Sequence, residues 1–232
     1  MQAVPKFGLY FSLRTMIKTV TLPYGRVIEV SYDIPRFVNE VLEQGEYSFL
    51  NVYETIIDIG CNIGTFSLYM SEKAKHIYAI DLAERNIDCL KETIIFNNLE
   101  NIKPFVAAIS GDGKPRVVDR GEDNSGSSGV WKFGTESKNV FTMKTLTLEQ
   151  FMDREKIEYA DLVKIDVEGA EREIVNKRFP KDRVGIVIGE SHAEKWNSLE
   201  DLLIQVAKLE SAFERLGYHF LRFGRHFVAR KR

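Results

Sequence analysis

The order of apolar and polar positions predicts short buried strands that alternate with helices. The strands are expected at residues 55–59, 77–80, 105–109, 162–165 and 184–188. The helices between them are expected at residues 65–73, 83–97, 148–154 and from about residue 170. In the helix at 83–97, the apolar side is expected to consist of Ile87, Leu90, Ile94 and Ile95. Apolar strands that alternate with helices indicate βαβ units and a mostly parallel sheet.

Hairpin patterns are found near both ends of the chain. Within residues 1–35, runs of β-branched and aromatic residues flank the turn Pro23-Tyr24-Gly25, which predicts a β-hairpin extension. A helix is expected at residues 35–42. After a long helix at residues 199–216, the chain has the pattern of a terminal hairpin around Gly224. No repeat or linker divides the sequence, so we expect one domain over residues 1–232.

A loop is expected at residues 111–138, which are rich in Gly, Ser, Asp and Lys, with a strand at residues 117–118. Long loops in compact domains are often functional segments. Trp131 and Phe133 in this loop, and Trp196 after the fifth strand, are candidates for lining a substrate pocket. Ordinary packing explains such aromatic residues equally well.

The first strand runs into the segment D-I-G-C-N-I-G at residues 58–64. Glycines permit a tight turn, and exposed amides at a helix start form a site for an anionic group. The dinucleotide fingerprint G-x-G-x-x-G is not matched, because the spacing here is Gly60-x-Asn62-x-Gly64. This departure disfavours an NAD-dependent oxidoreductase, and a plain tight turn remains the alternative.

Two further strand ends carry candidate cofactor residues. Asp81 ends the second strand, where a carboxylate accepts hydrogen bonds from ribose hydroxyls in nucleotide-binding sheets. Capping of the following helix is an alternative that is compatible with this role. Ala108, near the end of the third strand, is small enough to leave room for an adenine ring, although simple core packing explains it as well.

The fourth strand leads into K-I-D-V-E-G-A-E at residues 164–171. Together with the D-I-G-C-N-I-G turn, this segment resembles the FkbM family of methyltransferases from about residue 44 to residue 232. The resemblance implies a Rossmann-like class I methyltransferase fold, an α/β structure with helices on both faces of the sheet. Its seven-stranded, mostly parallel sheet has the order 3-2-1-4-5-7-6. The implied cofactor is S-adenosyl-L-methionine, and the implied reaction is O-methylation of a small molecule such as a sugar, a lipid-linked glycan or a polyketide-type metabolite.

The resemblance and the strand ends together define an expected cofactor site. Its residues are Glu46, Asp58, Gly60, Asn62, Gly64, Asp81, Ala108 and Asp166. The acid and the turn at 58–64 are implied to hold the methionine portion of the cofactor. Glu46 belongs to a segment that resembles the family's stretch beside the cofactor, and a helix stop followed by a surface loop is the alternative.

The acceptor side is expected at the ends of the fourth and fifth strands. Asp166, Glu190 and His192 are the candidate catalytic residues, with His192 as general base because an imidazole titrates near neutrality. Glu190 is expected to orient that imidazole or to bind substrate. Glu168 and Glu171 are candidates for substrate binding, although acids in a first helical turn are also stabilising by themselves. Carboxylates and an imidazole cluster here, which leaves a divalent metal open as an alternative, but no ligand spacing requires one and none is expected.

Composition and charge narrow the range of binding partners that we expect. The formal net charge is −2, and acids follow the fourth strand, so we expect a small-molecule acceptor and no nucleic acid. The sequence predicts no signal peptide and no membrane span, and the two cysteines form no metal or disulfide pattern, which favours the cytoplasm. A non-catalytic S-adenosylmethionine-binding or scaffold protein with the same fold is the alternative function.

Overall fold

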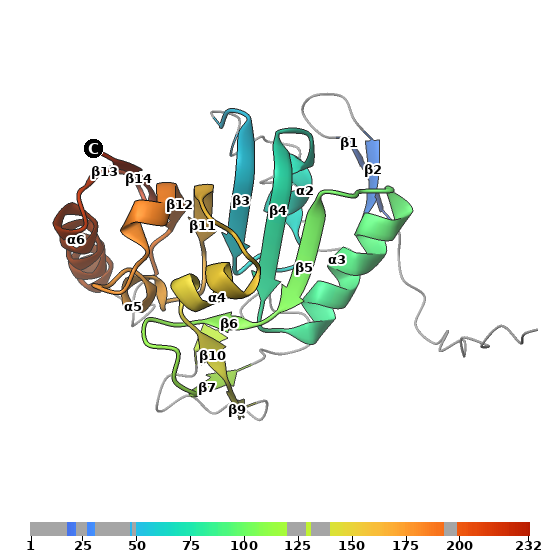
Figure 1. The fold of residues 1–232 in the computed structure, drawn as a ribbon. Helices are drawn as coiled ribbons and strands as arrows, with labels where there is room; N and C mark the ends of the chain where they lie inside the picture. The colour runs from blue at the N-terminus through green and yellow to red at the C-terminus, as the bar shows by residue number, and fades with distance from the viewer. Residues whose placement is uncertain are drawn as a thin grey trace, which may run out of the picture.

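The computed structural model describes residues 18–21, 27–30, 47, 50–119, 129–130, 140–192 and 199–232. A seven-stranded sheet in the order β13-β14-β12-β11-β3-β4-β5 forms its centre (Figure 1). The strands are β3 (Tyr53–Ile59), β4 (Ala74–Asp81), β5 (Ile102–Val106), β11 (Ala160–Ile165), β12 (Val184–Glu190), β13 (Tyr218–Phe223) and β14 (His226–Lys231). In this sheet β14 runs opposite to the other six strands, which are parallel to one another. Numbered along the chain from β3, the order is 3-2-1-4-5-7-6, which confirms the predicted class I methyltransferase fold.

Helices cover both faces of the sheet, because successive residues of its buried strands point to opposite sides. One face packs against α2 (Thr65–Tyr69), the 3-10 turn η2 (Met70–Glu72) and α3 (Glu84–Phe96). The other face packs against α4 (Leu148–Arg154), α5 (Glu171–Ile174) and α6 (Leu199–Arg215). Ile56 belongs to the first core and Ile57 to the second, and both side chains are fully buried. A second 3-10 turn, η3 (Lys181–Arg183), precedes β12.

Two details of the predicted elements were wrong. The third strand does not cover residues 105–109: β5 begins earlier, at Ile102, and ends at Val106. The following β6 (Ala108–Ile109) instead pairs with β10 (Thr145–Leu146) in a separate two-stranded sheet. In α3, Ile95 is exposed and Thr93 is buried, because a helical residue directly after Ile94 is turned away from the core.

The segments outside the main sheet form small antiparallel units. At the N-terminal end, β1 (Lys18–Thr21) pairs with β2 (Val27–Val30), which confirms the predicted hairpin. In the predicted loop region, β7 (Arg116–Asp119) pairs with β8 (Gly129–Val130) and with β9 (Val140–Met143). The predicted strand at 117–118 is therefore confirmed as part of a three-stranded sheet.

Several predictions fall outside the described residues, namely the helix at 35–42 and the residues Glu46, Trp131, Phe133 and Trp196. The domain boundaries and the cytoplasmic location stay predictions. In the described part of the chain, no helix combines the length and the apolar character that crossing a bilayer requires.

Candidate functional site

A glycine-containing bend joins β3 to α2 at the carboxyl edge of the sheet. Gly60 has a φ of +78°, and a Cβ at this position would lie 1.8 Å from the backbone oxygen of Asp166. Gly64 has a φ of +87°, and a Cβ there would meet the Leu90 side chain at 2.4 Å. Since Asp166 N also donates to Ile59 O at 3.0 Å, the bend lies directly against the end of β11. The two motifs recognised in the sequence are therefore in contact.

Asp58 lies beneath this bend with no exposed surface. Its Oδ2 accepts a hydrogen bond from Ser67 Oγ at 2.7 Å, and its Oδ1 lies 3.7 Å from Lys164 Nζ. Lys164 is itself buried, and its Nζ donates to Asp166 Oδ2 at 3.1 Å. Burial would lower the pKa of Lys164, but the charges of Asp166 and Asp58 outweigh this effect and raise it. The ammonium therefore stays charged and connects the first motif to the second.

Asp81 fastens the bend to the end of β4. Its Oδ2 accepts from Asn62 N at 2.9 Å, and its Oδ1 accepts from Ala83 N at 2.8 Å and from Asn86 Nδ2 at 3.2 Å. Burial raises the pKa of this carboxyl, although the hydrogen bonds favour the charged form. Asp81 thus holds the turn before α3, but it does not cap the helix as the alternative prediction had it, because the N-cap residue is Ala83 and no side chain caps α3. Asp81 also lines the adjacent cavity.

The cavity next to the bend has a volume of about 40 Å³. Gly60, Asp81, Ala108 and Val167 line it from the sheet edge, and Val118 of β7 lies on its wall. Of the predicted cofactor residues, the structure brings Gly60, Asp81 and Ala108 to this cavity. Asn62 and Gly64 shape the bend beside it, and Asp58 lies below.

An acid cluster surrounds His192, which follows the end of β12. The buried imidazole makes a hydrogen bond through Nδ1 with Glu171 Oε1 at 2.8 Å. Its Nε2 lies 3.6 Å from Glu168 Oε2, 3.8 Å from Asp166 Oδ1 and 4.0 Å from Glu190 Oε1. The four predicted acceptor-side acids therefore lie around the fifth predicted residue, His192. Of these five residues, Glu171 and His192 line a cavity of about 460 Å³.

These carboxylates change the protonation of His192. Burial favours the neutral ring, but the hydrogen bond to Glu171 and the charges of Asp166 and Glu168 outweigh it and raise the pKa of His192 to about 9. At neutral pH the ring of His192 is therefore mostly protonated, and an imidazolium donates hydrogen bonds but accepts no proton. The role of His192 as general base requires the neutral ring and stays a prediction.

Glu171 and Glu190 differ from their expected positions in the cluster. Glu171 is buried, and besides His192 its Oε1 accepts from Val167 N at 3.2 Å and Gly169 N at 3.1 Å. Glu190 is paired with Arg225, Nε to Oε1 at 2.8 Å. The carboxylate that orients the imidazole is therefore that of Glu171. Glu168, in contrast, retains a partly exposed side chain.

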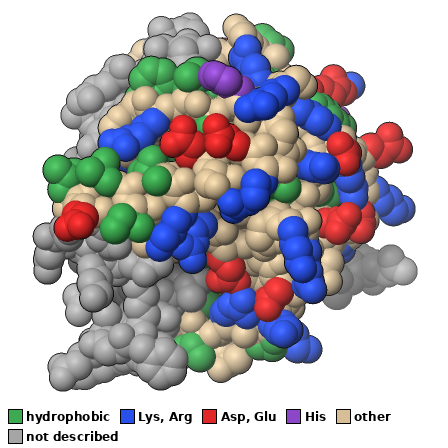
Figure 2. Space-filling model, turned by 90° about the vertical axis from the view of Figure 1, so that its left-hand side faces the viewer, with side chains coloured by type: hydrophobic (Ala, Val, Ile, Leu, Met, Phe, Trp, Pro, Cys, Tyr) green, Lys and Arg blue, Asp and Glu red, His purple; other side chains and the backbone are tan. Residues whose placement is uncertain are grey.

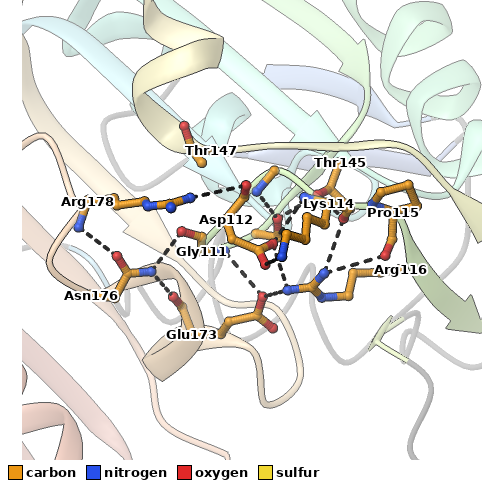
Figure 3. A network of polar contacts seen from close by, with 12 residues as sticks. Gly111, Asp112, Lys114, Pro115, Arg116, Thr145, Thr147, Glu173, Asn176 and Arg178 are labelled. Carbon is orange, nitrogen blue, oxygen red and sulfur yellow. Dashed lines mark hydrogen bonds and ion pairs between the residues drawn. The ribbon is translucent and has the colours of Figure 1, made fainter.

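A polar network ties the segment after β6 to α5 (Figure 3). Arg116 of β7 contacts Asp112 Oδ1 at 2.8 Å and also pairs with Glu173 of α5. Asn176 Nδ2 donates to Gly111 O at 2.9 Å. Glu173 lies two residues after Glu171, which contacts His192. The network therefore connects β7, which lines the cofactor-side cavity, to the helix that carries Glu171.

Sequence reasoning assigned no role to Lys164 or Arg116. For Lys164 a signal was present, because a lysine two residues before Asp166 lies on the same side of the strand. Its partner Asp58 became identifiable only from the register, in which Lys164 stands opposite Asp58. For Arg116 the local sequence offers only Asp112, four residues earlier, and it gives no sign of the partner Glu173, which is 57 residues away in the chain.

Two curated relatives match a short part of the chain. The chain is 32% identical over 76 residues to an uncharacterized RNA methyltransferase of Clostridium tetani, a match that covers 33% of this chain and 16% of that protein. Over 66 residues it is 32% identical to the ribosomal protein L11 methyltransferase of a Thermoanaerobacter species, covering 27% of this chain and 21% of the relative. The chain thus spans only a small part of the curated relatives that it matches.

Two solved structures share the fold. The methyltransferase FkbM from Methylobacillus flagellatus superposes with a TM-score of 0.51 at 13% identity, over 80% of this chain and 46% of that one. Trm5b from Pyrococcus abyssi gives a TM-score of 0.51 at 13% identity, over 94% of this chain and 55% of that one. The family model described as the methyltransferase FkbM domain matches residues 58–220. The chain therefore belongs to the FkbM family of S-adenosylmethionine-dependent methyltransferases.

Proposed function

We propose that this chain transfers the methyl group of S-adenosylmethionine to a hydroxyl of a small molecule, such as a sugar, a lipid-linked glycan or a polyketide-type metabolite. The observation that carries the proposal is the contact between the Gly60 bend and Asp166. This contact puts the predicted cofactor site next to a cluster of carboxylates and an imidazole. Such a cluster suits an acceptor that must lose a proton before it attacks.

On the cofactor side, Gly60, Asn62 and Gly64 shape the bend that approaches the methionine portion. Asp81 and Ala108 line the nucleoside cavity, and Asp58 supports the bend from below through Ser67 and Lys164. A nucleoside bound there would lie against β7, because Val118 of this strand is on the cavity wall. S-adenosylmethionine itself supplies the methyl group on a positively charged sulfur.

On the acceptor side, Asp166, Glu190 and His192 bind the hydroxyl and hold it in line with the methyl carbon. Glu168 faces the substrate, and Glu171 holds the imidazole through Nδ1. Holding two reactants at attack distance supplies a large part of such a rate enhancement. The oxygen forms a bond to the methyl carbon, the carbon–sulfur bond breaks, and the sulfur keeps its electron pair. The hydroxyl proton leaves to the carboxylate–imidazole cluster.

The test is transfer of a deuterated methyl group from labelled cofactor to metabolite extracts, followed by mass spectrometry of the labelled products. We expect a methyl ether that survives alkaline hydrolysis, and we expect Asp166→Asn to lose the labelling. Calorimetry with S-adenosylhomocysteine accompanies it. A methyl group on nitrogen or carbon overturns O-methylation. Binding of S-adenosylhomocysteine without any labelled product supports the scaffold alternative.

One observation favours a second candidate, transfer to RNA. A hollow of about 1470 Å³ between α6 and the segment from α5 to η3 shares Arg172, Glu173 and Asn176 with the cavity at His192. Figure 2 views the α6 side of the molecule and shows Lys and Arg side chains spread over it, with acids among them. The hollow is lined by eight basic residues, Arg116, Arg172, Lys177, Arg178, Lys181, Arg183, Lys208 and Arg215, and by four acids, Asp112, Glu149, Glu173 and Asp182.

The excess of basic residues suits an anionic acceptor, although the whole chain is acidic. Some relatives are named as RNA methyltransferases, but they match only a fraction of the chain. The same labelling experiment with total RNA distinguishes the two candidates. Label in nucleosides, and its loss in Lys208→Ala, would replace the small-molecule acceptor by RNA.

A further inference from the structure

A set of three side chains at the carboxyl edge has the composition of a metal site. Among the described residues, Asp166, Glu168 and His192 each offer one donor atom, and these atoms all lie within 4.8 Å of one another. Imidazole nitrogen with carboxylate oxygen is a ligand set typical of first-row divalent ions. We infer that Asp166, Glu168 and His192 bind one divalent transition-metal ion of the Mn²⁺ type, contrary to the expectation from the sequence.

The distances around the imidazole support coordination. Nε2 lies 3.6 Å from Glu168 Oε2 and 3.8 Å from Asp166 Oδ1. A charge-assisted hydrogen bond has a length of roughly 2.7–2.9 Å, so these contacts are too long for direct bonding. Two donors that bind one ion at about 2.1 Å each are separated by roughly 3–4 Å. The distances from Nε2 to the two carboxylates are thus those expected between ligands of a shared ion.

Glu168 provides a second, independent indication of a bound cation. Its Oε2 is shielded from solvent and accepts no hydrogen bond in the described part of the chain. Leaving such an oxygen without a partner is unfavourable. Glu168 also has a φ of +56°, a left-handed conformation that is strained for a residue with a side chain. A bound cation would satisfy this oxygen.

The surroundings resemble those of established metal ligands in proteins. A ligating histidine usually has its other nitrogen fixed by a carboxylate, which orients the ring. Glu171 Oε1 takes this position at 2.8 Å from His192 Nδ1 and is itself held by two loop amides. Rotation of the imidazole is therefore restricted, and Nε2 is directed toward the carboxylates of Asp166 and Glu168.

The charge balance points the same way. Asp166, Glu168, Glu171 and Glu190 place four negative charges around the imidazole. Among the described residues paired with them, Lys164 and Arg225 supply two positive charges. Lys164 is shared with the buried Asp58, so negative charge remains in excess around the imidazole, and a divalent ion would reduce this excess. The imidazole binds a metal in its neutral form. Its catalytic use, stabilising the oxygen of the acceptor as its proton leaves, rests on the proposed function.

The test is calorimetric titration of MnCl₂ into the full chain after treatment with EDTA. We expect one ion per chain, with weaker binding of CaCl₂ because Ca²⁺ prefers oxygen donors. Glu168→Gln and Asp166→Asn should each weaken Mn²⁺ binding by about tenfold or more, equivalent to ~1.4 kcal/mol. Asp88→Asn, which removes an exposed acid on α3, is the control and should bind as the wild type.

Thermal unfolding is the second measurement, and it distinguishes loss of metal binding from misfolding of a variant. Mn²⁺ should raise the unfolding temperature of the wild type and of Asp88→Asn, but not that of Glu168→Gln. Absence of Mn²⁺ binding by the wild type, or equal affinity in Glu168→Gln, would overturn the site. S-adenosylhomocysteine is titrated into the same samples. If this ligand fails to bind, the proposed function fails while the result for Mn²⁺ stands by itself.

Discussion

Lys164 is the residue on which the two motifs of the site depend. It is a buried cation between Asp58, which has no exposed surface, and Asp166. Buried ion pairs contribute little compared with an apolar replacement of the whole pair, but loss of one partner leaves an uncompensated charge. Removing Lys164 alone is therefore expected to be more harmful than replacing the whole group of charges by apolar residues.

Replacing Lys164 by Met should lower the free energy of unfolding by about 3–5 kcal/mol, because the buried Asp58, whose pKa burial already raises, must then stay charged without its cation or take up a proton. Urea denaturation measures this loss. Lys75→Met is the matched control, since Lys75 pairs with Glu54 on the surface with 65% and 62% of the two side chains exposed. That change should cost about 0–1 kcal/mol. Similar losses in both variants would contradict the role of Lys164, whereas adding Asp58→Asn should recover stability.

Gly60 is the second position where one residue decides the site. In Gly60→Ala the new Cβ would lie 1.8 Å from the backbone oxygen of Asp166, so the bend or the end of β11 must shift. We expect the affinity for S-adenosylhomocysteine, measured by calorimetry, to fall by about tenfold or more. Gly217→Ala is the control, because Gly217 has a φ of +89° and nothing within 4 Å of a Cβ. The control carries the same backbone penalty without the clash and should keep the wild-type affinity.

At the scale of elements, β7 and α5 behave as a coupled pair. The contacts of Arg116 with Asp112 and Glu173 join the strand to the helix (Figure 3). The strand forms a wall of the cavity proposed for the nucleoside, and the helix carries Glu171, which holds His192. A movement of β7 is therefore expected to change the position of Glu171 and of the His192 imidazole.

Arg116→Leu should release this coupling. Amide hydrogen exchange of residues 111–119 should become faster by about tenfold, because local opening no longer breaks the ion pairs. Mass spectrometry of peptic fragments measures this rate. Lys91→Met, which removes an exposed pair with Asp88 on α3, should leave the segment unchanged. Unaltered exchange at 111–119 in Arg116→Leu would mean that strand pairing alone holds the wall.

At the scale of the whole molecule, the terminal hairpin completes the sheet and the core. The rings of Phe213 on α6, Phe220 on β13 and Phe227 on β14 lie within 5.6–5.8 Å of one another, measured between centroids. Aromatic contacts of this kind add to the stabilisation that apolar burial provides. Since β14 also pairs with β12, this cluster supports the strand that ends at Glu190 and leads to His192.

Phe213→Ala should lower the free energy of unfolding by about 3–5 kcal/mol, through lost burial and a residual cavity. We expect far-UV and near-UV circular dichroism to report one shared transition, because the hairpin and the sheet form one core. Phe223→Ala removes a ring that is 64% exposed and should change stability by only about 0.5 kcal/mol. Two separate transitions in Phe213→Ala would indicate that the C-terminal region folds independently.

The sequence by itself determined the strand–helix order, the family and most of the residues at the carboxyl edge. This was possible because apolar runs, glycine turns and strand-end acids such as Asp81 and Asp166 are local signals that act within a few residues. The extent of the third strand was predicted wrongly, because local pattern is not decisive there. Residues 108–109 read as a continuation of the third strand, and only their pairing with β10 separated them from it.

The tertiary structure decided which charges meet. Glu171 and His192 are 21 residues apart, and Lys164 stands opposite Asp58 only through the register of β11 on β3. Such contacts depend on strand pairing over long distances in the chain, which no local pattern encodes. The pKa of a buried group, and the ion that a cluster can hold, follow from these neighbours rather than from the residue itself. The sequence therefore names the acids of the site, and the fold assigns each of them its partner.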